Sequence, residues 1–119
     1  MNIAHWLDRA AKRWPAAPAL LLGSEMVADY AAFNARAGGF ARFLAEEAGV
    51  APGDRVVLFM KNSPEYLIAL FGIWKAGAAA VPVNAKLHPK EANWIIKHSG
   101  ARLALVSESL AEGFEAPST

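Results

Sequence analysis

Residues 55–83 read RVVLFMKNSPEYLIALFGIWKAGAAAVPV, and the fold class depends on this stretch. Val56 to Met60 is a short, fully apolar run, which is typical of a buried strand. Ser63-Pro64 can then start a helix, and Gly77 lies where that helix should stop. Ala78 to Val83 is a second apolar run of strand type. The stretch therefore predicts strand, helix and strand in series, which places the two strands in parallel within one sheet.

The same alternation continues toward the C-terminus. Pro89 suits the first turn of another helix, which extends to His98, and Leu103 to Val106 is a third apolar run of strand type. Strands that alternate with crossover helices pair in parallel with right-handed connections, so we expect a layered α/β sheet. The helix between the first two strands, Glu65 to Lys75, is apolar nearly all round and should therefore be buried on more than one side.

Toward the N-terminus the pattern predicts an amphipathic helix. Asn2 can cap its start and Pro15 closes it. Its apolar stripe, at helical spacing, consists of Ile3, Trp6, Leu7, Ala10 and Trp14. Both tryptophans of this stripe, together with Trp74 in the apolar helix, are expected in the core, whereas the pattern leaves the place of Trp94 open.

A β-hairpin should follow this helix. The runs Ala19 to Leu22 and Met26 to Tyr30 have strand character, and they flank the turn-forming residues Gly23-Ser24-Glu25. Two such runs joined by a glycine-containing turn predict antiparallel pairing.

A second helix is predicted after the hairpin. Asp29 can cap its start, and Gly49 ends it. One face of this helix is apolar and consists of Phe33, Ala37, Phe40 and Leu44. Gly38-Gly39 inside it lowers the helix propensity, and we expect these glycines to let another element approach closely.

Composition limits the classes of protein to which the chain can belong. At 119 residues it fits one domain that buries its own core, and 55% hydrophobic with 19% charged residues excludes a disordered chain. Twelve basic and eleven acidic residues are scattered along the sequence, which argues against a nucleic-acid partner.

The same composition argues against export and against a membrane span. The chain has no cysteine, and Asp8 and Arg9 interrupt the opening stretch where a secretory signal would be apolar. Tyr66 to Val83 is apolar over about the length of a membrane span. Lys75 and Gly77, however, divide it into a short helix and a short strand. We therefore expect a cytoplasmic protein without a transmembrane segment.

In a parallel sheet, ligands bind beyond the carboxyl ends of the strands. The loops expected there are Lys61-Asn62-Ser63, Asn84-Ala85-Lys86 and Ser107-Glu108-Ser109. None of the three carries a complete catalytic, cofactor-binding or metal site by its sequence. A phosphate-binding loop would need closely spaced glycines that open a helix, and the chain has none at these strand ends.

The remaining polar residues also favour structural roles. Ser63 is followed by Pro64 and is interpreted as a helix cap, and adjacent Glu46-Glu47 do not face each other on a helix. No histidine has a second one at metal-ligand spacing among His5, His88 and His98. The lysines are spread over several elements and are interpreted as solvated ends; they are Lys61, Lys75, Lys86, Lys90 and Lys97. We therefore assign no catalytic, cofactor-binding or metal residue.

A series of short motifs gives the chain a family resemblance. In order they are Gly49-Val50-Ala51-Pro52-Gly53-Asp54-Arg55-Val56, Asn62-Ser63-Pro64-Glu65, Lys75-Ala76-Gly77-Ala78, Val81-Pro82-Val83-Asn84 and Ser99-Gly100-Ala101. From about Pro18 to Val106 the chain resembles the N-terminal region of adenylate-forming (AMP-binding) enzymes, and most of all an acyl-CoA synthetase. One departure lies at Asp29-Tyr30-Ala31-Ala32, where the family usually has a threonine cap and a glutamate three residues later; Ala32 cannot complete that capping box.

The resemblance implies a parent enzyme that activates a carboxylic acid with ATP to an acyl-adenylate and transfers the acyl group to coenzyme A, with the help of magnesium. The family's phosphate loop, its ribose-holding aspartate and its C-terminal domain have no counterpart in this sequence. Residues 1–119 are therefore expected to be an incomplete N-terminal subdomain that is inactive alone, whose partner is the remainder of its own polypeptide and which can self-associate. The alternative is a freestanding small α/β binding or protein-interaction module.

Overall fold

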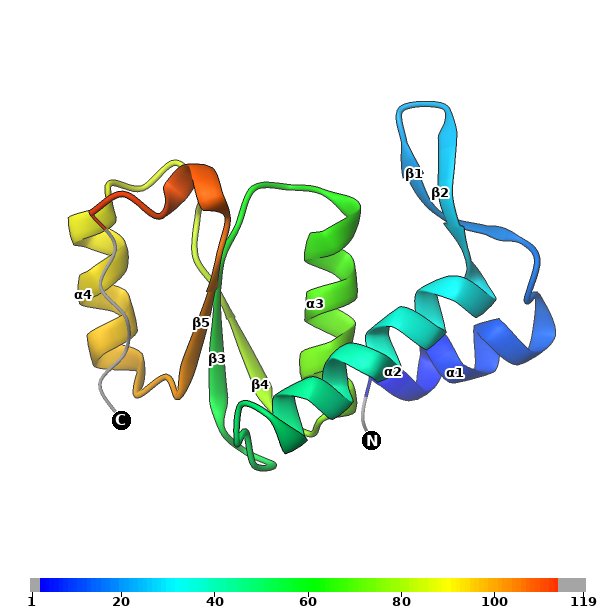
Figure 1. Cartoon of the computed structure of the whole chain (residues 1–119), viewed down its shortest axis with the longest axis horizontal. Coiled ribbons are helices and arrows are strands. Elements are labelled where there is room, and N and C mark those ends of the chain that lie inside the picture. Colours follow the sequence, from blue (N-terminus) through cyan, green and yellow to red (C-terminus); the bar gives the residue numbers. More distant parts are fainter. Residues whose placement is uncertain (1–2, 114–119) are drawn as a thin grey trace.

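The computed structural model describes residues 3–113. It contains a three-stranded parallel sheet with helices on both faces and, beside it, an N-terminal helix and a β-hairpin (Figure 1). The elements are α1 (Ala4–Arg13), β1 (Pro18–Leu22), β2 (Glu25–Asp29), α2 (Tyr30–Glu46), β3 (Arg55–Phe59), α3 (Pro64–Lys75), β4 (Ala79–Pro82), α4 (Pro89–Ser99), β5 (Leu103–Val106) and the short 3-10 helix η1 (Glu108–Leu110). The predicted α/β class and the predicted order of elements are confirmed. The predicted cap Asn2 lies outside the described residues.

The sheet has the order β4-β3-β5, with both neighbours parallel to β3. In the register of this sheet, Val57 pairs with Val81 on one side and with Ala104 on the other. The four residues from Val56 to Phe59 are completely buried. A continuous apolar run of this kind is what a central strand covered on both faces requires.

The helices α3 and α4 cover opposite faces of the sheet (Figure 1). Val56 and Leu58 lie in one buried cluster with residues of α2 and α3. Val57 and Phe59 lie in another cluster, with Ile96 of α4. Successive side chains of a strand point to opposite faces, so this alternation fixes which helix lies on which side.

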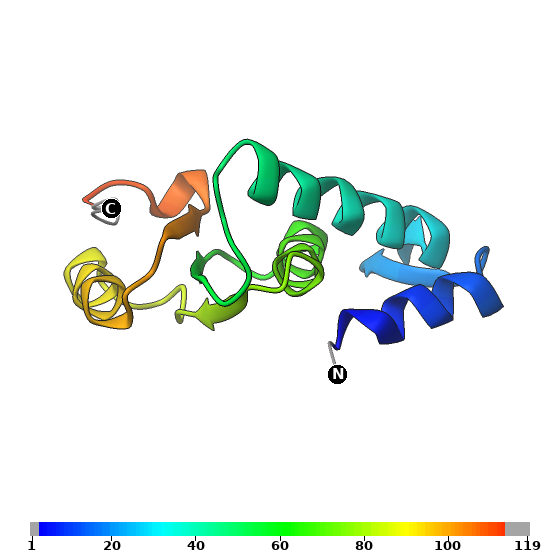
Figure 2. The same ribbon diagram turned by 90° about the horizontal axis from the view of Figure 1, so that it is seen from below.

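Helix α3 is buried on two sides, as its composition predicts. Ala69 and Ile73 face the cluster between the sheet and α2. Ile68 and Phe71 pack against a separate cluster formed by α1, the hairpin and α2. Seen along the perpendicular direction, α3 lies between the sheet and the N-terminal elements (Figure 2). It therefore joins the two parts of the molecule.

The close approach of α2 to α3 occurs at Gly72. A Cβ atom on this residue would lie 2.7 Å from Cδ2 of Phe40 and 3.2 Å from the carbonyl oxygen of Ala37. The expectation that Gly38-Gly39 permits the close approach is wrong, because a Cβ at either glycine would meet nothing within 4 Å. The face of α2 that packs on α3 carries Ala37 and Phe40, and the two glycines lie away from that contact.

The prediction that Trp6 and Trp14 are core residues is also wrong. Their exposed fractions are 49% and 54%, and Trp94 is exposed as well, whereas Trp74 is half-buried. Trp6 contacts the rings of Tyr30 and Phe71, each at 6.2 Å between centroids, and is otherwise open to solvent. The buried stripe of α1 is narrower than the sequence suggests and consists of Ala4, Leu7 and Ala10.

Side-chain caps form at the starts of α2, α3 and α4. Asp29 accepts a hydrogen bond from the backbone N–H of Ala32 at 2.8 Å, and Ser63 accepts one from Tyr66 at 3.3 Å. His88 caps α4 in the same way through Nδ1, at 3.1 Å from the backbone nitrogen two residues later. Asp29 thus caps α2 although the capping box is incomplete.

An ion pair links α1 to α3. Nζ of Lys75 lies 2.7 Å from Oδ1 of Asp8, and the lysine side chain is only 14% exposed. The interpretation of Lys75 as a solvated end is therefore wrong. The hydrogen bond from Lys75 outweighs the effect of burial and lowers the pKa of Asp8 from its ordinary value of 3.8.

The lowered pKa of Asp8 makes its contribution to stability depend on pH. A carboxylate with a depressed folded-state pKa stabilises the fold above its unfolded pKa and loses this effect as the pH falls through the folded value. We expect Asp8→Asn to lower the free energy of unfolding at pH 7 by less than about 1 kcal/mol, because Asp8 is 42% exposed. In urea melts the difference should shrink as the pH falls below 3.8 and vanish below the folded-state pKa of Asp8. In a protein that already carries Lys75→Met, Asp8→Asn should cause no further loss of stability. If Asp8→Asn lowered the free energy of unfolding equally with and without Lys75, the pairing would be contradicted.

Gly77 ends α3 in a left-handed conformation, with φ of +79°, as predicted. A β-branched side chain resists this conformation, and a Cβ here would lie 3.3 Å from Cβ of Pro52. We expect Gly77→Val to lower the free energy of unfolding by more than about 1 kcal/mol. The control Gly39→Ala, in open space within α2, should raise it by about 0.5–1 kcal/mol. Equal denaturant midpoints for wild type and Gly77→Val would show that this conformation carries no cost.

Candidate functional site

The chain reverses its direction across the sheet after β4, which connects back past β3 to β5. β3 leads into α3 on one face of the sheet, and the neighbouring strand β4 leads into α4 on the other face. The loops that leave these two strands lie at the carboxyl edge of the sheet, where parallel sheets bind their ligands. A hollow of about 470 Å³ lies there, lined by Met60, Lys61, Asn62, Tyr66, Pro82, Val83, Asn84, Ala85 and Lys86. We call it the strand-end hollow.

The strand-end hollow combines cations with neutral polar groups. Lys61 comes from the loop after β3 and Lys86 from the loop after β4, and no aspartate or glutamate belongs to the lining. Neither lysine forms an ion pair within the described residues 3–113. Asn62, Asn84 and Tyr66 add side-chain amide and hydroxyl groups. Interpreted one by one these lysines are solvated ends, but the fold brings two of them to one hollow.

Hydrogen bonds hold the loops around the hollow. The backbone N–H of Lys86 donates to Oδ1 of Asn84 at 2.9 Å, which closes a tight turn after β4. The backbone N–H of Lys61 donates to Oγ of Ser107 at 2.9 Å, which ties the loop after β3 to the loop after β5. The hollow thus has fixed walls on both sides.

The third loop named from the sequence lies elsewhere. Ser109 lines a different hollow of about 490 Å³ on the α4 face, together with His88, Lys90 and Glu112. Of the three predicted strand-end loops, the fold therefore brings two together around one hollow, and the third reaches them only through the Ser107 hydroxyl.

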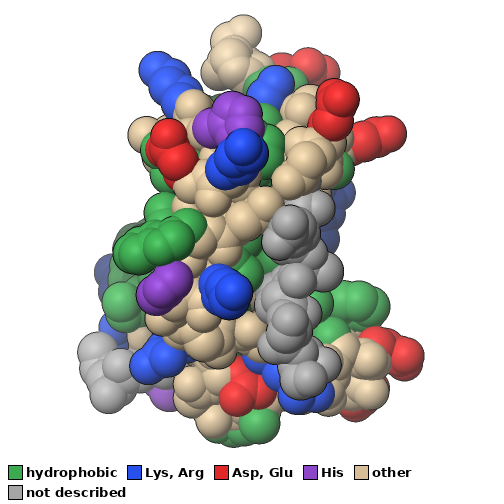
Figure 3. Space-filling model, turned by 90° about the vertical axis from the view of Figure 1, so that its left-hand side faces the viewer, with side chains coloured by type: hydrophobic (Ala, Val, Ile, Leu, Met, Phe, Trp, Pro, Cys, Tyr) green, Lys and Arg blue, Asp and Glu red, His purple; other side chains and the backbone are tan. Residues whose placement is uncertain are grey.

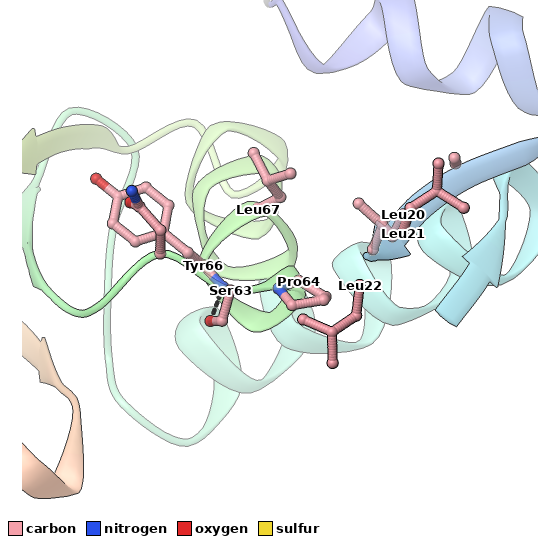
Figure 4. A pocket seen from close by; sticks show the side chains of 9 residues that line it. Leu20, Leu21, Leu22, Ser63, Pro64, Tyr66 and Leu67 are labelled. Atoms are coloured by element: carbon pink, nitrogen blue, oxygen red, sulfur yellow. Dashed lines mark hydrogen bonds between the residues drawn. The ribbon is translucent and has the colours of Figure 1, made fainter. Parts of the chain in front are cut away.

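A second, apolar hollow of about 450 Å³ lies between the hairpin and the start of α3. Leu20, Leu21 and Leu22 line it from β1, and Pro64 and Leu67 line it from α3 (Figure 4). Sequence reasoning did not find this hollow. The available signal was that consecutive leucines in β1 put apolar side chains on both faces of a two-stranded ribbon.

The other titratable side chains of the described residues offer no metal site. Within residues 3–113, no group of three histidine, aspartate or glutamate side chains could hold a metal ion. The imidazole of His98 stacks on Trp94 at 4.1 Å and contacts its carbonyl oxygen through Nδ1, while Glu46 and Glu47 are exposed. On the α4 side of the molecule, basic and acidic side chains are interspersed (Figure 3).

None of the helices within the described residues is long and apolar enough to cross a membrane. The apolar stretch from Tyr66 to Val83 is divided between α3 and β4, as predicted.

Comparison with known proteins shows the family. The AMP-binding enzyme family matches residues 7–118, and the chain therefore belongs to it. It is 35% identical over 114 residues to a long-chain-fatty-acid–CoA ligase of Haemophilus influenzae. This alignment covers 96% of the chain and 20% of the relative. It is 42% identical over 59 residues, half of the chain, to a crotonobetaine/carnitine–CoA ligase of Escherichia coli, of which it covers 11%.

Solved structures agree with this assignment. The N-terminal domain of FACL13 from Mycobacterium tuberculosis superposes with a TM-score of 0.88 at 35% identity, over 95% of this chain and 29% of that one. A benzoate CoA ligase from Burkholderia xenovorans gives a TM-score of 0.87 at 27% identity, over 95% of this chain and 23% of that one. The chain thus spans about a fifth of the length of the long-chain-fatty-acid–CoA ligase that it matches.

Proposed function

We propose that residues 1–119 are the N-terminal part of an ATP-dependent acid–thiol ligase, an acyl-CoA synthetase. The observation that supports this proposal is that nearly the whole chain matches CoA ligases, including the N-terminal domain of one of them. In the proposed reaction, a carboxylate oxygen attacks the α-phosphate of ATP and pyrophosphate leaves. The thiol of coenzyme A then attacks the acyl carbonyl of the adenylate, and AMP leaves.

We assign the chemistry of this reaction to residues outside this sequence. The described residues offer no cluster of carboxylates for magnesium, and the sequence has no glycine-rich phosphate loop. The role of these residues is to build the sheet β4-β3-β5 and the packed unit of α1, α2, α3 and the hairpin, on which the rest of the polypeptide folds.

The 119-residue chain should therefore bind ATP no better than weakly and form no acyl-adenylate. We expect no pyrophosphate release when it is incubated with ATP, Mg²⁺ and a series of fatty and aryl acids, and no micromolar ATP affinity in calorimetry. The matched control is the longer polypeptide encoded by the same reading frame, which should release pyrophosphate with at least one of these acids. Turnover by the 119-residue chain, or none by the longer polypeptide with any acid, would contradict the proposal.

The exposed apolar surface gives a further prediction for the isolated chain. Leu21 and Leu22 of the hairpin, with exposed fractions of 56% and 63%, lie beside exposed Leu67 of α3. In the described residues, β4 and β5 are also edge strands with a free side. Uncovered apolar patches and open strand edges both favour association.

We expect the chain to self-associate, with the apparent mass in light scattering rising with concentration and a hydrophobic dye bound. Leu22→Lys should reduce both the association and the dye binding if the hairpin hollow takes part. Lys12→Gln, a change on the exposed side of α1, should affect neither. A strictly monomeric particle that binds no dye would show that these residues close their own core.

A further inference from the structure

We propose that the strand-end hollow binds a small organic anion, with Lys61 and Lys86 holding its phosphate or carboxylate group. The proposal concerns residues of this chain alone and does not rest on the proposed ligase reaction. It combines three observations: the place of the hollow in the sheet, the charge of its lining and its shape.

The hollow lies at the carboxyl edge of the parallel sheet. Open α/β sheets bind their ligands beyond the carboxyl ends of the parallel strands. β3 and β4 are neighbouring parallel strands, so the loops that follow them meet at this edge. The lining residues 60–62 and 82–86 come from the ends of these two strands and the loops after them.

The lining is suited to an anion. Lys61 and Lys86 contribute two positive charges, no carboxylate in the lining offsets them, and neither has an ion-pair partner in residues 3–113. This contrasts with Lys75, whose charge is satisfied by Asp8 at 2.7 Å. Oδ1 of Asn84 already accepts the N–H of Lys86, so its NH₂ group is the part left to donate to a ligand. Charged donors bind phosphate and carboxylate oxygens more strongly than neutral donors do.

The size and the remaining lining define the ligand class further. A hollow of about 470 Å³ lies within the range of about 300–1,000 Å³ usual for small-molecule sites. Met60, Pro82 and Val83 supply apolar surface for an uncharged part of the ligand. Val83 is buried, and its N–H donates to the carbonyl oxygen of Leu58 at 2.8 Å, so this wall is part of the sheet. The geometry therefore suits a compact anion with an apolar body rather than a polymer.

The proposal can be tested by NMR titration of the ¹⁵N-labelled 119-residue chain at constant ionic strength. The probes are inorganic pyrophosphate and, separately, octanoate below its micelle concentration. We expect saturable shifts of the backbone amide signals around residues 60–62 and 82–86. Lys61→Gln/Lys86→Gln should weaken binding about tenfold, because both charged donors are lost. Each single variant should weaken binding about threefold, and since both lysines are exposed the thermal midpoints should not change.

The matched control is Lys90→Gln/Lys97→Gln, which removes the same two charges from α4. Its affinity for either probe should stay within about twofold of wild type, because exposed charges at a distance are screened by salt. Saturable binding of pyrophosphate supports the site with a phosphate ligand, and binding of octanoate supports it with a carboxylate ligand. Binding of neither probe, or equal weakening by the two double variants, would overturn the proposal. Neither outcome bears on ligase activity, which the longer polypeptide reports.

Discussion

Strand β3 is buried on both of its faces, and the arrangement of the sheet depends on this constraint. Four consecutive residues, Val56 to Phe59, are completely buried. Apolar groups on both faces must be covered, so the connection after β3 has to pack on one side and the connection after β4 on the other. The strand-end hollow lies at the carboxyl ends of β3 and its neighbour β4.

The second constraint is the contact between α2 and α3. Gly72 has no side chain, so the ring of Phe40 can pack directly against its backbone. A Cβ atom on Gly72 would lie only 2.7 Å from Cδ2 of that ring. This contact holds α3 between two hydrophobic clusters, one on the sheet and one under the hairpin. The ion pair between Asp8 and Lys75 adds a polar link between α1 and the same helix. Displacement of α3 would therefore disturb both clusters together.

The sequence predicts local features of this protein better than contacts between elements. Each strand and each α-helix was predicted, as were the caps at Asp29 and Ser63, because such signals lie within a few residues of each other; the short η1 was predicted as a loop. The predictions were wrong where packing against an element distant in the sequence determines whether a residue is buried. Periodicity placed Trp6 on the apolar stripe of α1 but could not show that the neighbouring elements leave it half outside. Likewise, the sequence does not show which helix lies against Gly72. The close approach between helices was therefore predicted at Gly38-Gly39 rather than at Gly72.

The strand-end hollow shows the same limit on the side of function. Lys61 and Lys86 lie on separate loops and have no motif between them, so each alone is interpreted as a solvated end. Parallel pairing of β3 with β4 brings both loops to the same edge. The walls are held by backbone hydrogen bonds, such as Val83 N–H to Leu58, whereas the two lysine side chains are exposed. Backbone atoms therefore stabilise the walls of the hollow, whereas the lysine side chains provide its charge. Substitution of these lysines can change the charge of the hollow without unfolding the protein.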